Sequence, residues 1–335
     1  MRLLHISHLH LGAGDEQEYG LEVLREIVDH TIALEVDGLL VSGHLTTPGA
    51  VLPPAARSLL GKLQCDLYVL PGVGESRENL DIKRCKLLDG SRFDLRVATS
   101  RDGERFEILS MPNELSFWQW NVLPKNHRWR VVVTNAGVLD LPETLDENAP
   151  GIDADFLRRL GVDYAAIGCV HETIEPRRCG ETGALVGCAG SARITEAGEV
   201  GPRVAILVEF DEGVRTQLIP LVAAGQSRAY VLRIEPNGEV PNIDEPWHPN
   251  DTVTLRLHGI VEDEDAKRRA LNTSRERWGS VVRHLGVDVT GLVASQSFIH
   301  AALARRLVTR WQARDLSDPS MRVFDIGVKA ITEES

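Results

Sequence analysis

The sequence lacks long apolar runs, paired cysteines and an excess of positive charge. No stretch approaches the roughly 18 consecutive apolar residues that a bilayer-spanning helix needs, and no signal-like core with a small-residue cleavage site follows Met1. The five cysteines are scattered and include no CxxC pair, which favours reduced thiols over a disulfide framework. We therefore expect a cytoplasmic globular protein with no membrane segment.

The charge balance argues against autonomous DNA binding. Lys and Arg total 37 and Asp and Glu total 49, which gives a formal net charge of −12. Proteins that bind nucleic-acid phosphates usually carry a basic surface, because neutralising phosphates releases counterions. Local basic clusters at 83–86 and 267–269 are more simply explained as solvated helix faces. DNA contact is therefore expected only through a larger complex.

Residues 1–222 alternate short apolar runs with helical patterns, which is typical of an α/β domain. After a hinge near 223–227, residues 228–295 are expected to form a second, smaller α/β unit. Residues 296–335 are expected to hold a C-terminal helix, ending near Trp311, and a tail. The main expected strands are 2–6, 38–42, 67–70, 106–110, 131–134, 164–167, 204–210, 214–221 and 252–257, and the main expected helices are 19–36, 53–63, 154–160 and 266–285.

Five short segments fall where an expected strand ends and a loop begins. The carboxyl ends of strands are where α/β proteins build ligand sites. Taken singly each segment is a weak signal, because a His-x-His is more often a surface or core pair than a metal site. The segments are SHLHLG at 7–12, SGHLT at 42–46, LPGVGE at 70–75, TNAG at 134–137 and IGCVH at 167–171.

In this order and spacing the segments resemble the motifs of calcineurin-like metallophosphoesterases: Asp-x-His, Gly-Asp, Gly-Asn-His-Asp/Glu, His-Gly and Gly-His-x-His. A later segment, 188–192, is similar to a turn of the same family, and 201–209 is similar to the strand that follows this turn in the SbcD exonuclease branch. The resemblance covers roughly residues 1–222. It implies a two-sheet α/β sandwich flanked by helices, followed by a small C-terminal α/β cap domain.

The resemblance places a set of metal and catalytic positions on this sequence, and only His10 and His171 keep the family residue. At the remaining positions the family's aspartate, asparagine or histidine is replaced. His8 and His44 stand in place of aspartates, and Val73 stands in place of an asparagine. Gly74 replaces the histidine that acts on the substrate, and Asn135 and Cys169 replace ligand histidines. Val73 and Asn135 are thus degenerate ligand positions.

These replacements remove the features that a two-metal site requires. A carboxylate can bridge two cations, whereas a neutral imidazole offers one lone pair. Hard ions such as Mn²⁺ prefer oxygen ligands, and Gly74 has no side chain to act as acid or base. We therefore expect neither a two-manganese centre nor a catalytic residue. The sequence favours a protein that is not an enzyme.

Two interpretations of the remaining donors stay open. A set of His and Cys side chains suits one tetrahedral zinc-like ion better than Mn²⁺, and the candidate ligands are His8, His10, His44, Cys169 and His171. The alternative is that hydrogen-bonded side chains fill these positions without a metal.

For function, the leading hypothesis is an inactive SbcD-like protein that serves as a scaffold or regulatory subunit in DNA repair. The resemblance implies an SbcC-type, SMC-like ATPase as its partner, and a homodimer, since this branch is often dimeric. The face of 296–311 that carries Ile299, Leu303, Leu307 and Trp311 is the expected docking surface, with internal packing as its alternative. The other hypotheses are a phosphodiesterase or nuclease with an altered His/Cys site, and a small-molecule binder.

Overall fold

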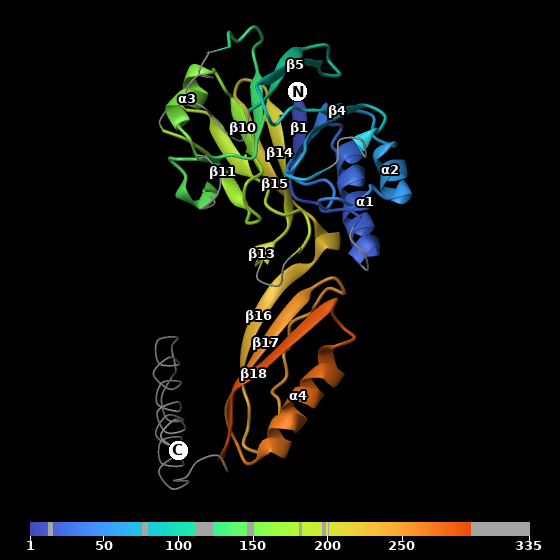
Figure 1. Ribbon diagram of the computed structural model, residues 1–335, viewed down its shortest axis with the longest axis vertical. Helices are drawn as coiled ribbons and strands as arrows, with labels where there is room; N and C mark the ends of the chain where they lie inside the picture. Colours follow the sequence, from blue (N-terminus) through green and yellow to red (C-terminus); the bar gives the residue numbers. More distant parts are fainter. Residues whose placement is uncertain are drawn as a thin grey trace. The chain divides into compact units, whose positions relative to one another are not determined.

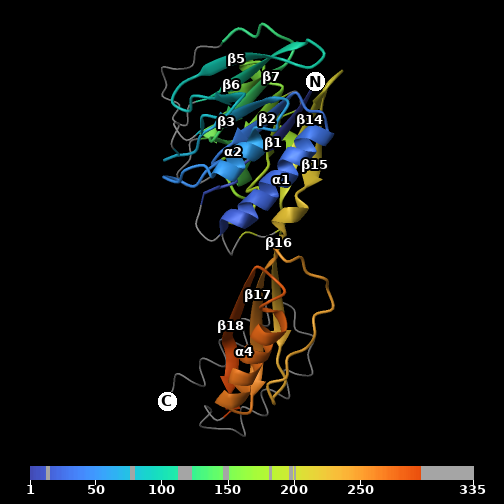
Figure 2. The same ribbon diagram turned by 90° about the vertical axis from the view of Figure 1, so that its right-hand side faces the viewer.

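The computed structural model describes residues 1–12, 16–75, 80–111, 123–145, 151–180, 183–195, 199 and 201–295. The chain divides into two units, Met1–Gln226 and the residues from Ser227 onward. Figures 1 and 2 show both units from two directions. The expected helix over 296–311 lies outside the described residues.

Two six-stranded sheets form the centre of the first unit (Figure 1). In the first sheet, the central strands run parallel because each is followed by a crossover connection. Its order is β15 (Val214–Pro220), β14 (Val204–Phe210), β1 (Arg2–Ile6), β2 (Gly38–Ser42), β3 (Asp66–Leu70) and β4 (Cys85–Leu87). The order of the second sheet is β11 (Ile174–Arg178), β12 (Leu185–Cys188), β10 (Tyr164–Ile167), β7 (Arg130–Thr134), β6 (Arg105–Ser110) and β5 (Asp94–Thr99).

The central strands are apolar on both faces because both faces are covered. Leu3, Leu40 and Tyr68 of the first sheet pack against residues of the second sheet such as Val131 and Tyr164. The outer face of the first sheet is covered by α1 (Gln17–Ala33) and α2 (Pro54–Leu60). The outer face of the second is covered by α3 (Ala154–Arg159). Continuous apolar runs are typical of strands buried in this way.

The shorter elements of the first unit lie in its connections. They are β8 (Gly137–Val138), β9 (Gly151–Ile152), β13 (Gly201–Pro202) and 3-10 helices at Pro142–Thr144 and Val222–Ala224. The expected fold class, a two-sheet α/β sandwich flanked by helices with a smaller α/β unit after it, is confirmed.

In its described residues, which end at Ser295, the second unit contains three parallel strands and one helix. The strands are β16 (Gln226–Arg233), β17 (Thr252–Val261) and β18 (His284–Ala294). Helix α4 (Glu264–Trp278) begins after Asp263, whose carboxylate accepts a hydrogen bond from the Ala266 amide. The apolar core of the unit includes Ala266, Ala270 and Trp278 of this helix.

The expected helix at 266–285 was wrong at its C-terminal end. Helix α4 stops at Trp278, and Gly279 follows it as the C-cap. Leu285, Val287 and Val289 belong to β18, where they alternate with small or polar residues. Within the described part of the chain, no helix combines the length and the apolar character needed to cross a membrane.

A buried hydrogen-bonded chain joins the two sheets at His5. The Ser42 hydroxyl donates to the Ile167 carbonyl at 3.1 Å, so it accepts from Nε2–H of His5 at 2.6 Å. The other ring nitrogen, Nδ1, then accepts from the Tyr164 hydroxyl at 2.8 Å. Burial lowers the pKa of His5 to about 3. His5 is thus a neutral, fully satisfied core histidine.

We expect His5 to make stability pH-dependent. Between pH ~6.5 and ~3 the unfolded chain binds a proton that folded His5 excludes, so the free energy of unfolding should fall by up to about 1.4 kcal/mol per pH unit on acidification. His5→Gln should reduce the slope of the free energy of unfolding against pH by the contribution of about one proton, which is about 1.4 kcal/mol per pH unit. Urea unfolding from pH 4 to 6.5 measures this slope. His127→Gln, outside the chain of bonds, is the control. An unchanged slope in His5→Gln would contradict the expectation.

Candidate metal centre

The candidate site lies where strands of both sheets end. His8 and His10 follow β1, His44 follows β2, and His171 follows β10 of the second sheet. The loops meet most closely at Gly168, where an added Cβ would lie 1.2 Å from the Ser42 carbonyl oxygen. Only glycine permits this approach. The two sheets therefore deliver their histidines to one place.

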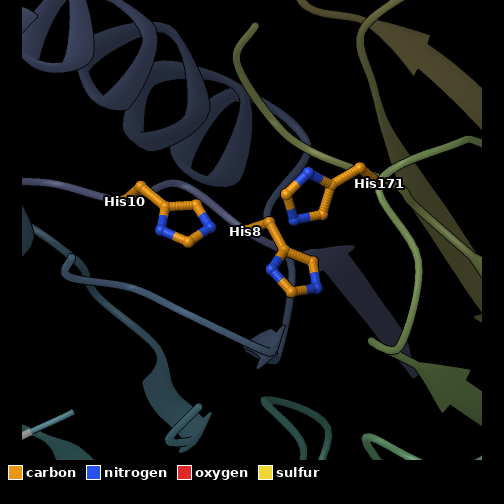
Figure 3. Close-up of side chains that lie close together, drawn as sticks. All are labelled: His8, His10 and His171. Atoms are coloured by element: carbon orange, nitrogen blue, oxygen red, sulfur yellow. The ribbon is translucent and has the colours of Figure 1, made fainter. Parts of the chain in front are cut away.

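His8, His10 and His171 form a group of three imidazoles (Figure 3). One ring nitrogen of each lies within 4.8 Å of the corresponding nitrogens of the other two. The ring centroids of His8 and His171 are 4.5 Å apart, and those of His8 and His10 are 5.5 Å apart. Around a tetrahedral zinc with bonds of about 2.0–2.1 Å the nitrogens would be about 3.3 Å apart, so binding needs only small side-chain movements.

The backbone that carries His8 and His10 is held in an uncommon conformation. Their φ angles are 47° and 48°, in the left-handed region that few non-glycine residues adopt. Arg193, almost fully buried, donates to the Leu9 carbonyl at 2.7 Å and to the His10 carbonyl at 2.8 Å. The Ser191 hydroxyl donates to the His8 carbonyl at 3.1 Å. These bonds fix the loop that presents the two imidazoles.

A second set of hydrogen bonds orients the His8 ring. Its Nε2–H donates to the Gly168 carbonyl at 2.8 Å. Because a carbonyl only accepts, the lone pair of His8 is on Nδ1. That nitrogen is buried without a hydrogen-bond partner, as is Nε2 of His10. A buried polar atom left unpaired costs about 1–3 kcal/mol, and a bound cation would remove this cost.

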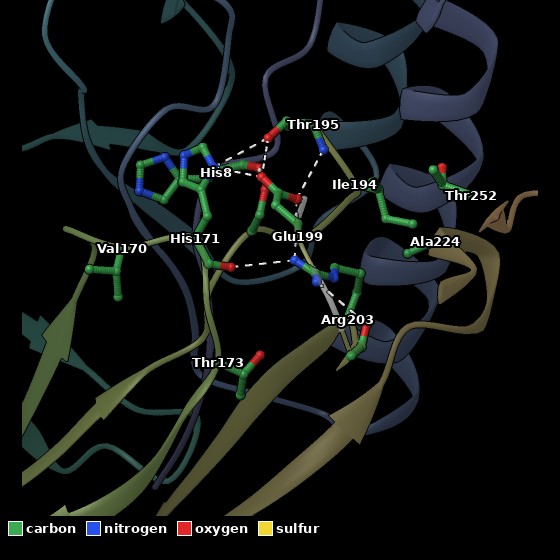
Figure 4. Close-up of polar contacts among 12 residues, drawn as sticks. His8, Val170, His171, Thr173, Ile194, Thr195, Glu199, Arg203, Ala224 and Thr252 are labelled. Carbon is green, nitrogen blue, oxygen red and sulfur yellow. Dashed lines mark hydrogen bonds and ion pairs between the residues drawn. The ribbon is translucent and has the colours of Figure 1, made fainter. Parts of the chain in front are cut away.

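His171 is oriented by a carboxylate, Glu199 (Figure 4). Nδ1–H of His171 donates to Oε1 of Glu199 at 2.6 Å, which leaves the lone pair of His171 on Nε2. The Thr195 hydroxyl and amide donate to the same carboxylate at 2.5 and 3.0 Å, and Arg203 pairs with it at 3.3 Å. Metal-bound histidines commonly have such a carboxylate behind them.

Glu199 remains ionised and buried in this position. Burial alone would raise its pKa, but the hydrogen bonds from His171 and Thr195 outweigh burial and the pKa is lowered. Sequence reasoning missed this residue, which lies 28 positions after His171 and belongs to none of the five segments. Its role becomes visible only in the folded chain.

His8 and His10 are neutral at physiological pH. Burial is the main reason that the pKa of each is lowered to about 3, and the neighbouring imidazoles, His171 for His8 and His44 for His10, lower it further. A neutral imidazole is the form that binds a metal. No proton therefore competes for these lone pairs near pH 7.

Two other expected ligands lie outside the group of three. The His44 ring lies beside it, with its centroid 4.8 Å from that of His10. Cys169 is a correction to the expected set, because its thiol donates to the Thr144 carbonyl at 2.7 Å. Cys169 therefore contacts the 3-10 helix at Pro142–Thr144 and is not part of the group of three.

The three remaining family positions differ in their surroundings, and only Asn135 has side-chain hydrogen bonds. The Asn135 amide, in the orientation that satisfies its neighbours, donates to the Gly168 and Ser42 carbonyls at 3.3 Å each. Val73 is 77% exposed. Gly74 has a φ of +78° and no side chain to offer.

This donor set fits one metal ion and not two. Within the described residues, no carboxylate oxygen joins the three ring nitrogens, so nothing there bridges a pair of cations. Three imidazole nitrogens suit Zn²⁺ and similar ions, whereas Mn²⁺ and Mg²⁺ favour oxygen. If bound, such an ion would supply a Lewis acid at the strand ends, held by His8, His10 and His171.

Comparisons with known proteins give only distant similarities. No protein-family model matches the chain, and no curated protein does. Among solved structures, the chain is similar to GAP50, the anchor in the inner membrane complex of Plasmodium, at 11% identity and a TM-score of 0.46, covering 67% of this chain and 85% of that one. It is similar to TT1561 of Thermus thermophilus at 11% identity and a TM-score of 0.42, covering 65% and 98%.

A further similar structure is Vps29 of Entamoeba histolytica complexed with Zn²⁺, at 16% identity and a TM-score of 0.33, covering 66% of this chain and 99% of that one. Similarity at this level is no basis for transferring a function.

We expect the purified protein to bind one equivalent of Zn²⁺ and to discriminate against Mn²⁺. Glu199→Gln should weaken Zn²⁺ binding about 10- to 100-fold, because the charge that orients His171 is lost. Competition with a chromophoric chelator measures the affinity. Glu172→Gln, which removes an exposed carboxylate nearby, is the matched control. Equal affinity in the Glu199 and Glu172 variants would contradict the assignment.

Proposed function

We propose that this chain is a metallophosphoesterase-like protein that has lost two-metal phosphoesterase chemistry and serves as a scaffold or regulatory subunit in DNA metabolism. The observation that carries the proposal is the composition of the ligand group, three imidazoles without a carboxylate oxygen among the described residues. In-line displacement at phosphorus relies on two cations that stabilise the attacking and leaving oxygens. One nitrogen-bound ion does not supply that arrangement.

The residues around the group support the same conclusion. Gly74, at the position of the family's catalytic histidine, offers no acid or base. Glu75, the next residue, is occupied as a structural acceptor: its Oε1 receives the Thr46 amide and hydroxyl at 2.6 and 2.8 Å, and its Oε2 receives the Gly72 amide at 3.0 Å. The carboxylate in this loop therefore joins the loops after β2 and β3.

The proposed partner is an SbcC-type, SMC-like ATPase, on the basis of the sequence resemblance. The net charge of −12 supports a protein that reaches DNA through a complex and not by itself. A homodimer is part of the same proposal, because the SbcD branch that the sequence resembles is often dimeric. The partner surface is assigned to the sequence pattern at 296–311.

A second candidate is a phosphodiesterase that uses one zinc-like ion. The specific observation in its favour is that three imidazoles leave a fourth tetrahedral position, as catalytic zinc sites do. This candidate requires an open position on the metal and a nearby proton donor. It differs from the first candidate in a measurable activity.

The two candidates are separated by a hydrolysis assay. With bis(p-nitrophenyl) phosphate and with single- and double-stranded DNA, we expect no turnover above background in the presence of Mn²⁺ or Zn²⁺, because no second ion and no general acid are provided. The His171→Ala variant is the control for contaminating enzymes. Hydrolysis by the wild type that His171→Ala abolishes would establish the second candidate and remove the first.

The scaffold proposal is tested by native purification of the tagged full chain. A large ATPase should co-purify, and His10→Ala or His171→Ala should leave its recovery unchanged, because assembly does not use the metal centre. Leu303→Glu with Leu307→Glu should reduce recovery at least tenfold by placing charge at two apolar positions of the sequence pattern at 296–311. Arg305→Glu, off that face, is the control. Unaltered recovery in the double variant would refute this docking surface.

A further inference from the structure

His44 has the features of a metal ligand although it lies outside the group of three. Its Nε2–H donates to the Val73 carbonyl at 3.1 Å. Because the carbonyl only accepts, the lone pair of His44 is on Nδ1. That nitrogen is buried and has no hydrogen-bond partner. His44 thus repeats the pattern of His8, with one nitrogen bonded to a backbone carbonyl and the other left unpaired.

The position of His44 is set by the same backbone that positions His10. The amides of Leu9 and His10 both donate to the His44 carbonyl, at 2.8 and 3.2 Å. The ring centroid of His44 lies 4.8 Å from that of His10 and 5.5 Å from that of His8. Its side chain is partly exposed, and its ring neighbours two of the three imidazoles of the group.

The loop after β3 is shaped around the His44 imidazole. An added Cβ on Gly72 would lie 2.3 Å from both Cδ2 and Nε2 of His44, so only glycine leaves room for the ring. The Gly72 amide is held by the Glu75 carboxylate at 3.0 Å. Glu75 also binds Thr46, two residues after His44. The ring therefore sits in a built recess and not on a loose loop.

We propose that His44 supplies the fourth nitrogen of a closed, four-imidazole site for a single tetrahedral ion of the zinc type. The inference rests on the single-metal centre of the proposed function and states its coordination. Each of three rings keeps one N–H on a fixed acceptor, namely Gly168 for His8, Val73 for His44 and Glu199 for His171. The opposite nitrogen of each ring is then free to bind the ion.

Closure has a functional consequence. Structural zinc sites are fully occupied by protein ligands, whereas catalytic sites keep one position for water or substrate. Four histidines leave no such position, so the centre would fasten the loops after β1, β2 and β10 to one another. It would stabilise the fold without hydrolysing phosphate esters. An open site with three histidines is the requirement of the competing, catalytic interpretation.

Cobalt(II) is the probe, because its visible absorption reports both coordination number and the entry of an added anion. The wild type loaded with one equivalent of Co²⁺ should show intense four-coordinate bands that azide does not change. His44→Ala should bind Co²⁺ at least 10- to 100-fold more weakly. Loss of a residue that only hydrogen-bonds to a metal ligand already weakens binding by this factor, and loss of the ligand itself should weaken it at least as much. The bands of His44→Ala should shift on adding azide, because water or azide now takes the fourth position.

Two further variants make the test independent of one substitution. Gly72→Ala pushes the imidazole out of its recess without removing it, and should give the same azide sensitivity as His44→Ala. His127→Ala, outside the site, should behave as the wild type, and circular dichroism checks that each variant is folded.

The outcomes distinguish the two proposals. Azide-sensitive bands in the wild type, or bands unchanged by His44→Ala, would overturn the closed site while leaving a single-metal centre in place. Failure of the wild type to bind Co²⁺ would overturn both.

Discussion

The candidate metal centre depends on hydrogen bonds made on the outer side of its imidazole rings. Each of His8, His44 and His171 gives its N–H to an atom that can only accept. The proton is thereby held away from the shared space, and the lone pair is directed into it. If these acceptors were absent, either tautomer of each ring would be allowed and the nitrogens would not be matched to a common ion. Val73 and Gly168 lie in loops that follow strands of different sheets, so the sandwich itself positions two of the three acceptors.

The local charge of the centre differs from that of the whole protein. The chain carries a formal charge of −12, yet within the described residues the ligand group consists of imidazoles and contains no carboxylate. Glu199 approaches only the far side of His171, and Arg203 pairs with it. Selection among divalent ions therefore falls to the donor atoms and not to the overall charge, which favours ions that accept nitrogen.

Much of the first unit could be predicted from the sequence. β1, β2, β10 and β14 have the expected bounds, because uninterrupted apolar runs between turns are typical of strands covered on both faces. β18 was missed, since Gly286, Asp288 and Thr290 interrupt its apolar residues and the helical pattern before it was extended too far. Periodicity alone does not locate the end of a charged helix.

The candidate site was predictable in part. The five motif segments do converge at the strand ends, because parallel strands deliver their following loops to one edge. The direction of the Cys169 thiol and the pairing of Glu199 with His171 were not predictable, because both depend on contacts with residues far apart in the chain. Local sequence specifies which donors are present, whereas the packing of loops decides which of them meet.

The left-handed backbone at His8 and His10 limits what evolution can place there. Apart from glycine, the residues that tolerate this conformation best are Asn, Asp and His, and two of these three are strong metal ligands. An exchange of Asp for His at position 8 would therefore leave the loop intact while changing an oxygen donor into a nitrogen donor. Such a loop can alter its preferred ion by a single codon change, without any rebuilding of the fold around it.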